Sequence, residues 1–197
     1  NARMKYLLYE KGINWFKDTL VTKYYRKPIK PLRKEPVNKL IDYLGWQKQN
    51  NQKWFVGLPL LSGRLTGNKK LTIRNLVENY GLDLRLTPNQ DVLICNISDK
   101  HKKEIELELK DIGYANLDNI NEIQRHALAC PALPLCGLAM TEAERILPDI
   151  LERIDNLLKS LNIEKTILFR ITGCPNGCSR PYMAELALVG SGLNKYQ

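Results

Sequence analysis

The sequence lacks a long uncharged run, and this absence excludes a helix that spans a membrane. The longest stretch without Asp, Glu, Lys or Arg extends from His126 to Thr141, which is too short for a bilayer and is interrupted by Pro131 and Pro134. The first residues also lack the apolar segment and the small-residue cleavage site of a secretory signal. We therefore expect no segment that crosses a membrane and no secretory signal.

Acidic residues are scarce in the first quarter of the chain. Residues 1–53 contain 13 Lys or Arg and 4 Asp or Glu, whereas residues 54–197 contain 17 of each, so the first quarter accounts for the whole formal net charge of +9. Three prolines among residues 26–36 favour an extended linker there. Such a basic segment can be a solvated connector, can steer an acidic partner protein or can contact nucleic-acid phosphates. We rank these roles in that order, because no nucleic-acid-binding motif accompanies the charge.

Short apolar segments separated by turn residues predict a small α+β unit after this basic region. The pattern before it, with Gly12 as an interruption, indicates two short helices within residues 3–26. Gly81 is placed to end a helix in the left-handed conformation. The elements expected in the α+β unit are a strand over 54–60, a helix over 70–80, strands over 82–86 and 91–97 joined by a tight turn, and a helix over 100–112.

The last third of the chain predicts a long amphipathic helix between two strands. Apolar residues recur at helical spacing from Ile146 to Leu161, and Thr141 with Glu144 forms a capping box before them. Pro148 is expected to kink or divide this helix. Residues 166–172 read as a buried strand that leads directly into a cysteine loop. A further strand starting near residue 185 has no evident partner in what remains of the chain.

Five cysteines, four of them late in the chain, indicate metal or redox chemistry in a reducing compartment rather than a disulfide framework. Cys130 and Cys136 form a C-x5-C pair, and Cys174 and Cys178 form a C-x3-C pair. Zinc sites usually use tighter pairs, whereas a 4Fe-4S cube takes one thiolate per iron and needs ligands further apart. The spacing favours an iron–sulfur cluster, with zinc or unrelated buried thiols as alternatives. Cys95 ends an apolar strand and is expected to be a core residue.

The residues around these cysteines add a family resemblance. The runs Ala129–Arg145 and Thr172–Glu185 resemble the two cluster motifs of the nitrite and sulfite reductases that carry sirohaem. The runs Asn1–Leu7 and Arg85–Gln90 are similar to the ferredoxin-dependent sulfite reductase branch of that family. The dipeptide Asn176-Gly177 favours sulfite over nitrite as the substrate.

The resemblance implies that Cys130, Cys136, Cys174 and Cys178 bind a 4Fe-4S cluster. It also implies that Cys178, the expected catalytic residue, bridges through its sulfur to the iron of sirohaem. A shared thiolate would couple the electron store directly to the iron that holds the substrate. The implied activity is the assimilatory six-electron reduction of sulfite to sulfide, with reduced ferredoxin as the electron donor and partner.

Five further residues are candidates for cofactor contacts under this resemblance. Arg180 is expected to offset cluster charge or to pair with a sirohaem carboxylate, against the alternative of a surface arginine. Arg85, Asn89 and Gln90 are expected to line the haem, although a tight turn between two strands explains the segment equally well. Asn89 stands where the corresponding motif of the family's first half has an arginine, so we do not assign it an anion-binding role. Asn176 has a similar alternative as a turn residue.

The resemblance also implies an α+β fold, in which a ferredoxin-like half-domain precedes a partial α/β cofactor-binding domain of the sirohaem reductase fold. We assign residues 1–43 to a basic connecting arm, 44–120 to the half-domain and 121–197 to an incomplete 4Fe-4S and sirohaem-binding domain. The chain resembles the second half of a two-half enzyme, so the N-terminal half is an expected partner. Cytoplasm is the expected location, with plastid stroma as an alternative. The alternative functions are a nitrite reductase of the same family and a metal-stabilised basic module that binds nucleic acid.

Overall fold

A computed structural model describes residues 4–28, 42–117 and 120–197, and the chain divides into two compact units, Asn1–Leu40 and Ile41–Gln197. The first unit contains helix α1 (Met4–Thr19) and a π-helix over Leu20–Tyr25. Gly12 is non-helical inside α1, with φ at 81°, so two short helices meet there as predicted. Most of the predicted linker lies outside the described residues. No helix in the described part of the chain has the length and apolar character needed to cross a membrane.

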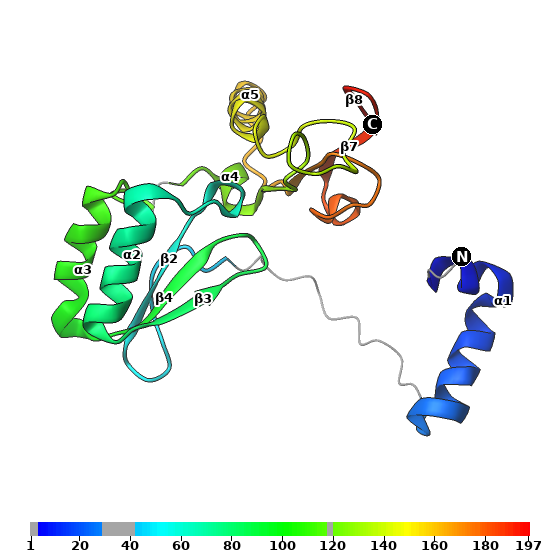
Figure 1. Ribbon diagram of the computed structural model, residues 1–197, viewed down its shortest axis with the longest axis horizontal. Coiled ribbons are helices and arrows are strands. Elements are labelled where there is room, and N and C mark those ends of the chain that lie inside the picture. Colours follow the sequence, from blue (N-terminus) through cyan, green and yellow to red (C-terminus); the bar gives the residue numbers. More distant parts are fainter. Residues whose placement is uncertain (1–3, 29–41, 118–119) are drawn as a thin grey trace. The chain divides into compact units, whose positions relative to one another are not determined.

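The second unit begins with a four-stranded antiparallel sheet (Figure 1). Its strands, in spatial order, are β1 (Gly45–Lys48), β2 (Trp54–Leu58), β4 (Val92–Ile97) and β3 (Asp83–Leu86). Helices α2 (Gly67–Tyr80) and α3 (Asp99–Asp111) lie side by side against this sheet. The core between helices and sheet is aliphatic and includes Val56, Ile73, Leu76, Ile94 and Ile105, each at most 2% exposed. The predicted α+β unit is therefore present.

The end of helix α2 agrees with the sequence prediction, whereas its start does not. Gly81 adopts the left-handed conformation after α2, and its N–H donates to the carbonyl of Val77, as predicted for a C-cap. The predicted helix over 70–80 begins three residues earlier, at Gly67. Strand β1 was not predicted, because four residues are too few to show a strand period. It exists because Gly45–Lys48 pairs antiparallel with Trp54–Gly57 across a short turn.

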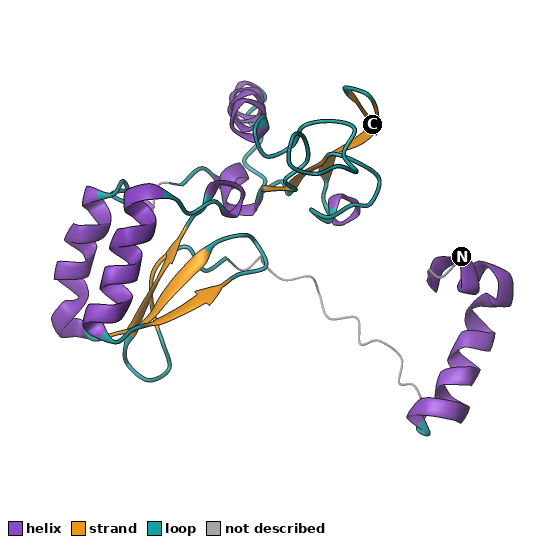
Figure 2. Ribbon diagram, in the orientation of Figure 1, coloured by secondary structure: helices purple, strands orange, loops and turns teal. Residues whose placement is uncertain are grey.

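A second sheet forms the last part of the chain and contains parallel strands (Figure 2). Its order is β5 (Leu128–Ala129), β6 (Phe169–Thr172), β7 (Leu186–Gly192) and β8 (Lys195–Tyr196). Strands β5 and β7 both run parallel to β6, and β8 runs antiparallel to β7. The expectation of an unpaired last strand is wrong, because β7 lies between β6 and β8.

Helix α5 (Leu147–Ser160) packs its apolar face on this second sheet, where Leu147 and Leu151 contact the cluster that contains Phe169 and Ile171. A shorter helix, α4 (Glu122–His126), precedes β5. The 3-10 turns Leu61–Gly63 and Pro181–Met183 complete the second unit. These elements give the last part of the chain its mixed α and β composition.

Two expectations about α5 are wrong. Pro148 does not kink the helix, because it occupies the first turn, where its missing N–H has no intrahelical acceptor to lose. The capping box also fails, because other residues bind the Thr141 N–H and the Glu144 carboxylate, and the Thr141 hydroxyl has no hydrogen-bond partner among the described residues. The N–H of Thr141 donates to the carbonyl of Gly173, and the Glu144 carboxylate accepts from Arg64 at 2.7 and 3.0 Å. The helix therefore begins at Leu147 instead.

Candidate functional site

The candidate site lies where β5 and β6 end. Cys130 directly follows β5, and Gly173-Cys174 directly follows β6. Because these neighbouring strands are parallel, their carboxyl ends meet at one edge of the sheet. The N–H of Cys130 donates to the carbonyl of Ile171 at 3.2 Å, which extends the pairing by one residue. Two cysteine loops far apart in the sequence therefore start side by side.

The sulfur of Cys130 receives hydrogen bonds from the second cysteine loop. The backbone N–H of Gly173 donates to Sγ at 3.2 Å, and the hydroxyl of Thr172 lies 3.4 Å from the same sulfur. The first loop is thus tied to the second through the atom proposed as a ligand.

Gly173 brings the two loops into backbone contact. Its carbonyl accepts from the N–H groups of Met140 and Thr141, at 2.8 and 3.3 Å. A Cβ atom at this position would lie 2.7 Å from the Cβ of Ala132, 2.8 Å from the carbonyl oxygen of Thr141 and 2.9 Å from the Cβ of Ala139. Only glycine fits between the loops at this separation.

The four cysteines differ in their access to solvent. Cys130 and Cys174 are both 8% exposed, Cys136 is half-buried and Cys178 is exposed. None of them forms a disulfide, so all four thiols are chemically available. Cys95 is also a free thiol, but it is buried in β4 of the other sheet, as predicted for a core residue. The site therefore has an inner and an outer cysteine on each loop.

The donors that the candidate site offers are four cysteine thiols. Among the residues that the structure describes, no three or more His, Cys, Asp or Glu side chains form a group that could hold a metal ion. A tetrahedral zinc ion needs four ligands about 2 Å from one point. A cubic 4Fe-4S cluster instead places each thiolate on a different iron atom and spreads its ligands more widely. Four cysteine thiols suit an iron–sulfur cluster, and they are also a donor set that structural zinc uses.

The turn between β3 and β4 reaches the first cysteine loop. The Thr87 hydroxyl oxygen accepts from the N–H groups of Asn89 and Asp91, at 3.2 and 3.1 Å, which makes the turn internally bonded. The Gln90 side chain then forms two bonds with Ala129, the residue before Cys130. Its Nε2 donates to the carbonyl at 2.9 Å and its Oε1 accepts from the N–H at 3.4 Å.

The same turn reaches the second cysteine loop. Arg180, two residues after Cys178, adopts a left-handed backbone conformation with φ at 59°. Its Nη2 donates to the carbonyl of Pro88 at 2.7 Å and lies 3.5 Å from Oδ1 of Asn89. The structure thus brings Asn89, Gln90 and Arg180 to the cysteine loops. Arg85 lies exposed in β3, and among the described residues no hydrogen bond joins its side chain to these loops.

Asn176 lies exposed in the second cysteine loop, between Cys174 and Cys178. The following residue, Gly177, has a positive φ of 69°, and its N–H lies 3.4 Å from the carbonyl of Cys174. The local backbone is therefore a tight turn, which agrees with the turn role weighed for Asn176. The turn also directs the Cys178 side chain to the surface.

Arg170 is a buried charged residue that sequence reasoning missed. It lies in the middle of β6 and is 6% exposed, and its Nε has no hydrogen-bond partner among the described residues. Burial, and then the nearby charge of Arg180, lowers the pKa of Arg170 to about 10. The available signal was a single arginine in the apolar run that precedes Cys174. A cation is therefore held inside the strand that leads to the cysteine loop.

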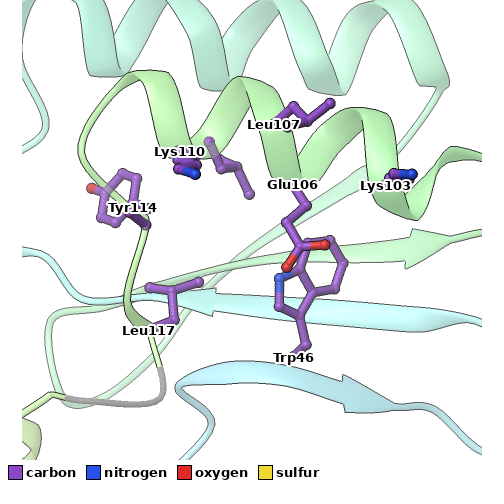
Figure 3. A pocket seen from close by; sticks show the side chains of 9 residues that line it. Trp46, Lys103, Glu106, Leu107, Lys110, Tyr114 and Leu117 are labelled. Carbon is purple, nitrogen blue, oxygen red and sulfur yellow. The ribbon is translucent and has the colours of Figure 1, made fainter.

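A cavity of about 260 Å³ lies elsewhere, in the half-domain (Figure 3). It is lined by Trp46 of β1, by residues of α3 such as Glu106 and Lys110, and by Tyr114 and Leu117 after that helix. No cysteine lines it. The cavity is thus separate from the candidate site, which is an assembly of loops.

Comparisons with known proteins match this chain to one family. Residues 47–112 match the family model described as the nitrite/sulfite reductase ferredoxin-like half domain. The "Sulfite reductase [ferredoxin]" of Synechococcus elongatus is 48% identical over 202 residues, covering 100% of this chain and 32% of that protein. The chain belongs to the nitrite/sulfite reductase family.

Other members of the nitrite/sulfite reductase family agree. The "Sulfite reductase [NADPH] hemoprotein beta-component" of Paenibacillus sp. is 37% identical, over 99% of this chain and 35% of that protein. The solved structure of the Mycobacterium tuberculosis NirA protein superimposes with a TM-score of 0.74 at 29% identity, covering 91% of this chain and 33% of that one. The chain spans about a third of the length of these relatives. Its fold is that of the sirohaem reductase family, as the sequence predicted.

Proposed function

We propose that this chain is the C-terminal portion of a sulfite reductase that receives its electrons from ferredoxin. The observation that carries the proposal is the meeting of two loops with four free cysteines at the ends of β5 and β6. Relatives named as sulfite reductases support it over the alternative of a nucleic-acid-binding module. Because the chain spans about a third of these relatives, the remaining part of the enzyme is its necessary partner.

The proposed ligands of a 4Fe-4S cluster are Cys130, Cys136, Cys174 and Cys178, and Cys178 is also the proposed bridge to the iron of sirohaem. When bound, the cluster supplies single electrons and the sirohaem iron supplies the position where the sulfite sulfur is held. Cys178 suits a shared role because it is the exposed member of the set. Cys130 and Cys174 lie inside and keep water from the cluster side.

The remaining proposed contacts belong to this chain's own polar groups. The Gly173 N–H and the Thr172 hydroxyl lie 3.2 and 3.4 Å from the Cys130 sulfur and would hold it against the second cysteine loop. Arg180 and Asn89 lie beside the loop that carries Cys178. Their proximity supports a contact with the cofactor edge, as it does for Gln90. Asn176 is exposed next to Cys178 and is proposed to face the cofactor as well.

The overall reaction explains why an electron store is needed beside the substrate. Conversion of sulfite to sulfide lowers the oxidation state of sulfur from +4 to −2, so it consumes six electrons and six protons and releases three water molecules. Ferredoxin delivers one electron at a time. The residues that hold the sulfite anion and supply protons are proposed to lie chiefly in the rest of the enzyme.

NADPH is the alternative to ferredoxin as the electron donor, and nitrite is the alternative to sulfite as the substrate. One reported relative is named for ferredoxin and another for NADPH, and the higher identity is to the ferredoxin protein. The basic first quarter of the chain also suits an acidic donor such as ferredoxin. Turnover of the full-length enzyme should be measured with reduced ferredoxin and with NADPH, and with sulfite and with nitrite. Faster turnover with NADPH or with nitrite would overturn the corresponding part of the proposal.

The cofactor assignment is tested by spectroscopy of the full-length protein. We expect haem absorption bands of sirohaem together with an EPR signal from a reducible iron–sulfur cluster. Analysis should find iron and acid-labile sulfide but no stoichiometric zinc. A protein that holds one zinc ion and no acid-labile sulfide would refute the proposed function.

Substitution of Cys178 should affect both cofactors. We expect Cys178→Ser in the full-length enzyme to weaken cluster retention and to abolish the magnetic coupling between cluster and haem, because one thiolate serves both. Cys95→Ala is the matched control, since Cys95 is a buried core thiol in the other sheet. EPR and absorption spectra report the result. Normal coupling in Cys178→Ser, or cofactor loss in Cys95→Ala, would show that the ligand set is misassigned.

A further inference from the structure

The turn of residues 87–90 contacts both cysteine loops, and we propose that it acts as a clamp that positions Cys178 relative to Cys130. This inference rests on the proposed function, because it assigns Gln90 and Arg180 as positioning residues for the cofactor bridge. The clamp residues act through the loops that they hold.

The clamp is rigid at its base. The turn joins β3 and β4, which pair antiparallel up to Leu86 and Val92. The N–H of Thr87 donates to the carbonyl of Asp91 at 3.0 Å, and the Thr87 hydroxyl oxygen accepts from two backbone N–H groups of the turn. Gln90 is in the left-handed conformation, with φ at 68°. A turn that satisfies its own backbone in this way moves as one body with its sheet.

Gln90 makes the contact between the turn and the first cysteine loop. Its side-chain amide donates to and accepts from the backbone of Ala129, at 2.9 and 3.4 Å. Strand β5 is only two residues long, and β6 pairs with one of its edges. The Gln90 amide therefore pairs with both the carbonyl and the N–H of Ala129, as the backbone of a neighbouring strand would do. The bond fixes the residue that directly precedes Cys130.

Arg180 makes the contact between the turn and the second cysteine loop. Its Nη2 donates to the carbonyl of Pro88 at 2.7 Å, across 92 positions of sequence. The residue is non-glycine in a left-handed conformation, which is costly unless its surroundings hold it. Its own N–H donates to the carbonyl of Gly177 at 2.8 Å, next to Cys178. A shift of Arg180 would therefore move the end of the loop that carries Cys178.

Together the contacts of Gln90 and Arg180 connect the residues beside Cys130 and Cys178 through one rigid turn. The half-domain thereby controls a distance within the cofactor site, although its own residues are not ligands. A second contact between the same parts offers a control. The Arg64 guanidinium binds the Glu144 carboxylate at 2.7 and 3.0 Å, but Glu144 lies eight positions beyond Cys136. This ion pair also connects the two parts of the chain, but neither of its residues is adjacent to a cysteine.

The experiment compares clamp and control variants in the full-length holoenzyme. The clamp variants are Gln90→Glu, which loses the donor to Ala129, and Arg180→Met, which loses the donor to Pro88. Arg180→Lys keeps a donor at nearly the same reach. Arg64→Met breaks the control ion pair. Each protein is measured for cluster reduction potential, for EPR line shape and haem coupling, and for kcat and KM with sulfite.

We expect Gln90→Glu and Arg180→Met to change the EPR line shape and the reduction potential and to lower kcat at least fivefold, with KM for sulfite within about twofold of the wild type. Arg180→Lys should recover part of the wild-type spectrum. Arg64→Met should lower the thermal midpoint but leave the spectrum and the potential unchanged. The thermal midpoint thus separates a folding defect from a positioning defect.

Two results would overturn the clamp. One is a wild-type spectrum and potential in cofactor-loaded Gln90→Glu and Arg180→Met. The other is an equal spectral change in Arg64→Met, which would show that any loss of contact between the two parts has the same effect. A wild-type protein with neither sirohaem bands nor a cluster signal would instead refute the proposed function, and the clamp with it.

Discussion

Asp91 is a residue whose charge opposes folding at neutral pH. The pKa of its carboxyl group is raised to about 6, chiefly by burial; a hydrogen bond from the N–H of Leu60 acts in the opposite direction, and the charge of Asp42 makes a smaller contribution that raises the pKa. In the unfolded chain the same pKa is about 3.9. The stabilising contribution of the protonated group is therefore complete below about pH 4 and is lost as the pH rises through about 6.

Asp91→Asn should accordingly stabilise the protein in a pH-dependent way. Asparagine keeps an oxygen that accepts from Leu60 and cannot ionise. We expect a gain in the free energy of unfolding of about 1–2 kcal/mol at pH 8 and about a third of that at pH 4.5, allowing for partial solvent screening of this half-buried group. Urea or thermal unfolding at both pH values measures it. A gain of equal size at both would contradict the assignment.

The role of a residue was predictable from the sequence where it depends on neighbouring residues. The spacing of Cys130, Cys136, Cys174 and Cys178 marked the candidate ligands, and Gly81 marked a helix end. The burial of Arg170 was not predictable in the same way. An arginine in an apolar run reads as a surface residue until the pairing of β6 with β5 and β7 places it inside a sheet.

At the scale of elements, contacts between loops override local preferences. Thr141 and Glu144 have the sequence of a capping box, yet Gly173 binds the backbone N–H of Thr141 and Arg64 binds the carboxylate of Glu144. The backbone contact through Gly173 then sets how closely the two cysteine loops approach. Loop spacing is therefore a property of this one glycine as much as of the cysteines.

Gly173→Ala should separate the two loops. The added methyl group would lie within 2.9 Å of three atoms, one of them a backbone oxygen, so the loops must move apart. We expect a loss of about 1–3 kcal/mol in stability and a clear loss of cluster iron and acid-labile sulfide from the full-length protein. Gly137→Ala in the first cysteine loop is the control, because nothing lies within 4 Å of its added Cβ. Equal iron contents in the two variants would argue against this role of Gly173.

The whole molecule is electrically asymmetric. The first 53 residues contain 13 basic and 4 acidic residues, and the remaining residues are balanced. In the described part of this basic segment, Lys17 and Lys23 are exposed on helices that bury no residue. A charged surface of this kind accelerates association with a partner of opposite charge and loses this effect in salt.

Ferredoxin binding should therefore weaken as salt is added. We expect the affinity of the full-length enzyme to fall at least threefold between about 50 and 500 mM salt, since screening shortens the range of the attraction. Lys17→Glu with Lys23→Glu should weaken binding at low salt more than Lys70→Glu, which changes one exposed charge on α2 of the balanced part. Calorimetry at each salt concentration measures the affinities. Affinity independent of salt would exclude steering by this segment.

The longer helices and strands, the helix end at Gly81, the candidate ligand cysteines and the asymmetric charge could all be inferred from the sequence, because each depends on residues within a few positions of one another. Tertiary structure decided the short strands β1, β5 and β8, the start of α5, the burial of Arg170 and the contacts of Gln90 and Arg180. These last contacts span 39 and 92 positions. Parallel pairing of β5 and β6 brings such distant residues together, and no local pattern records that register.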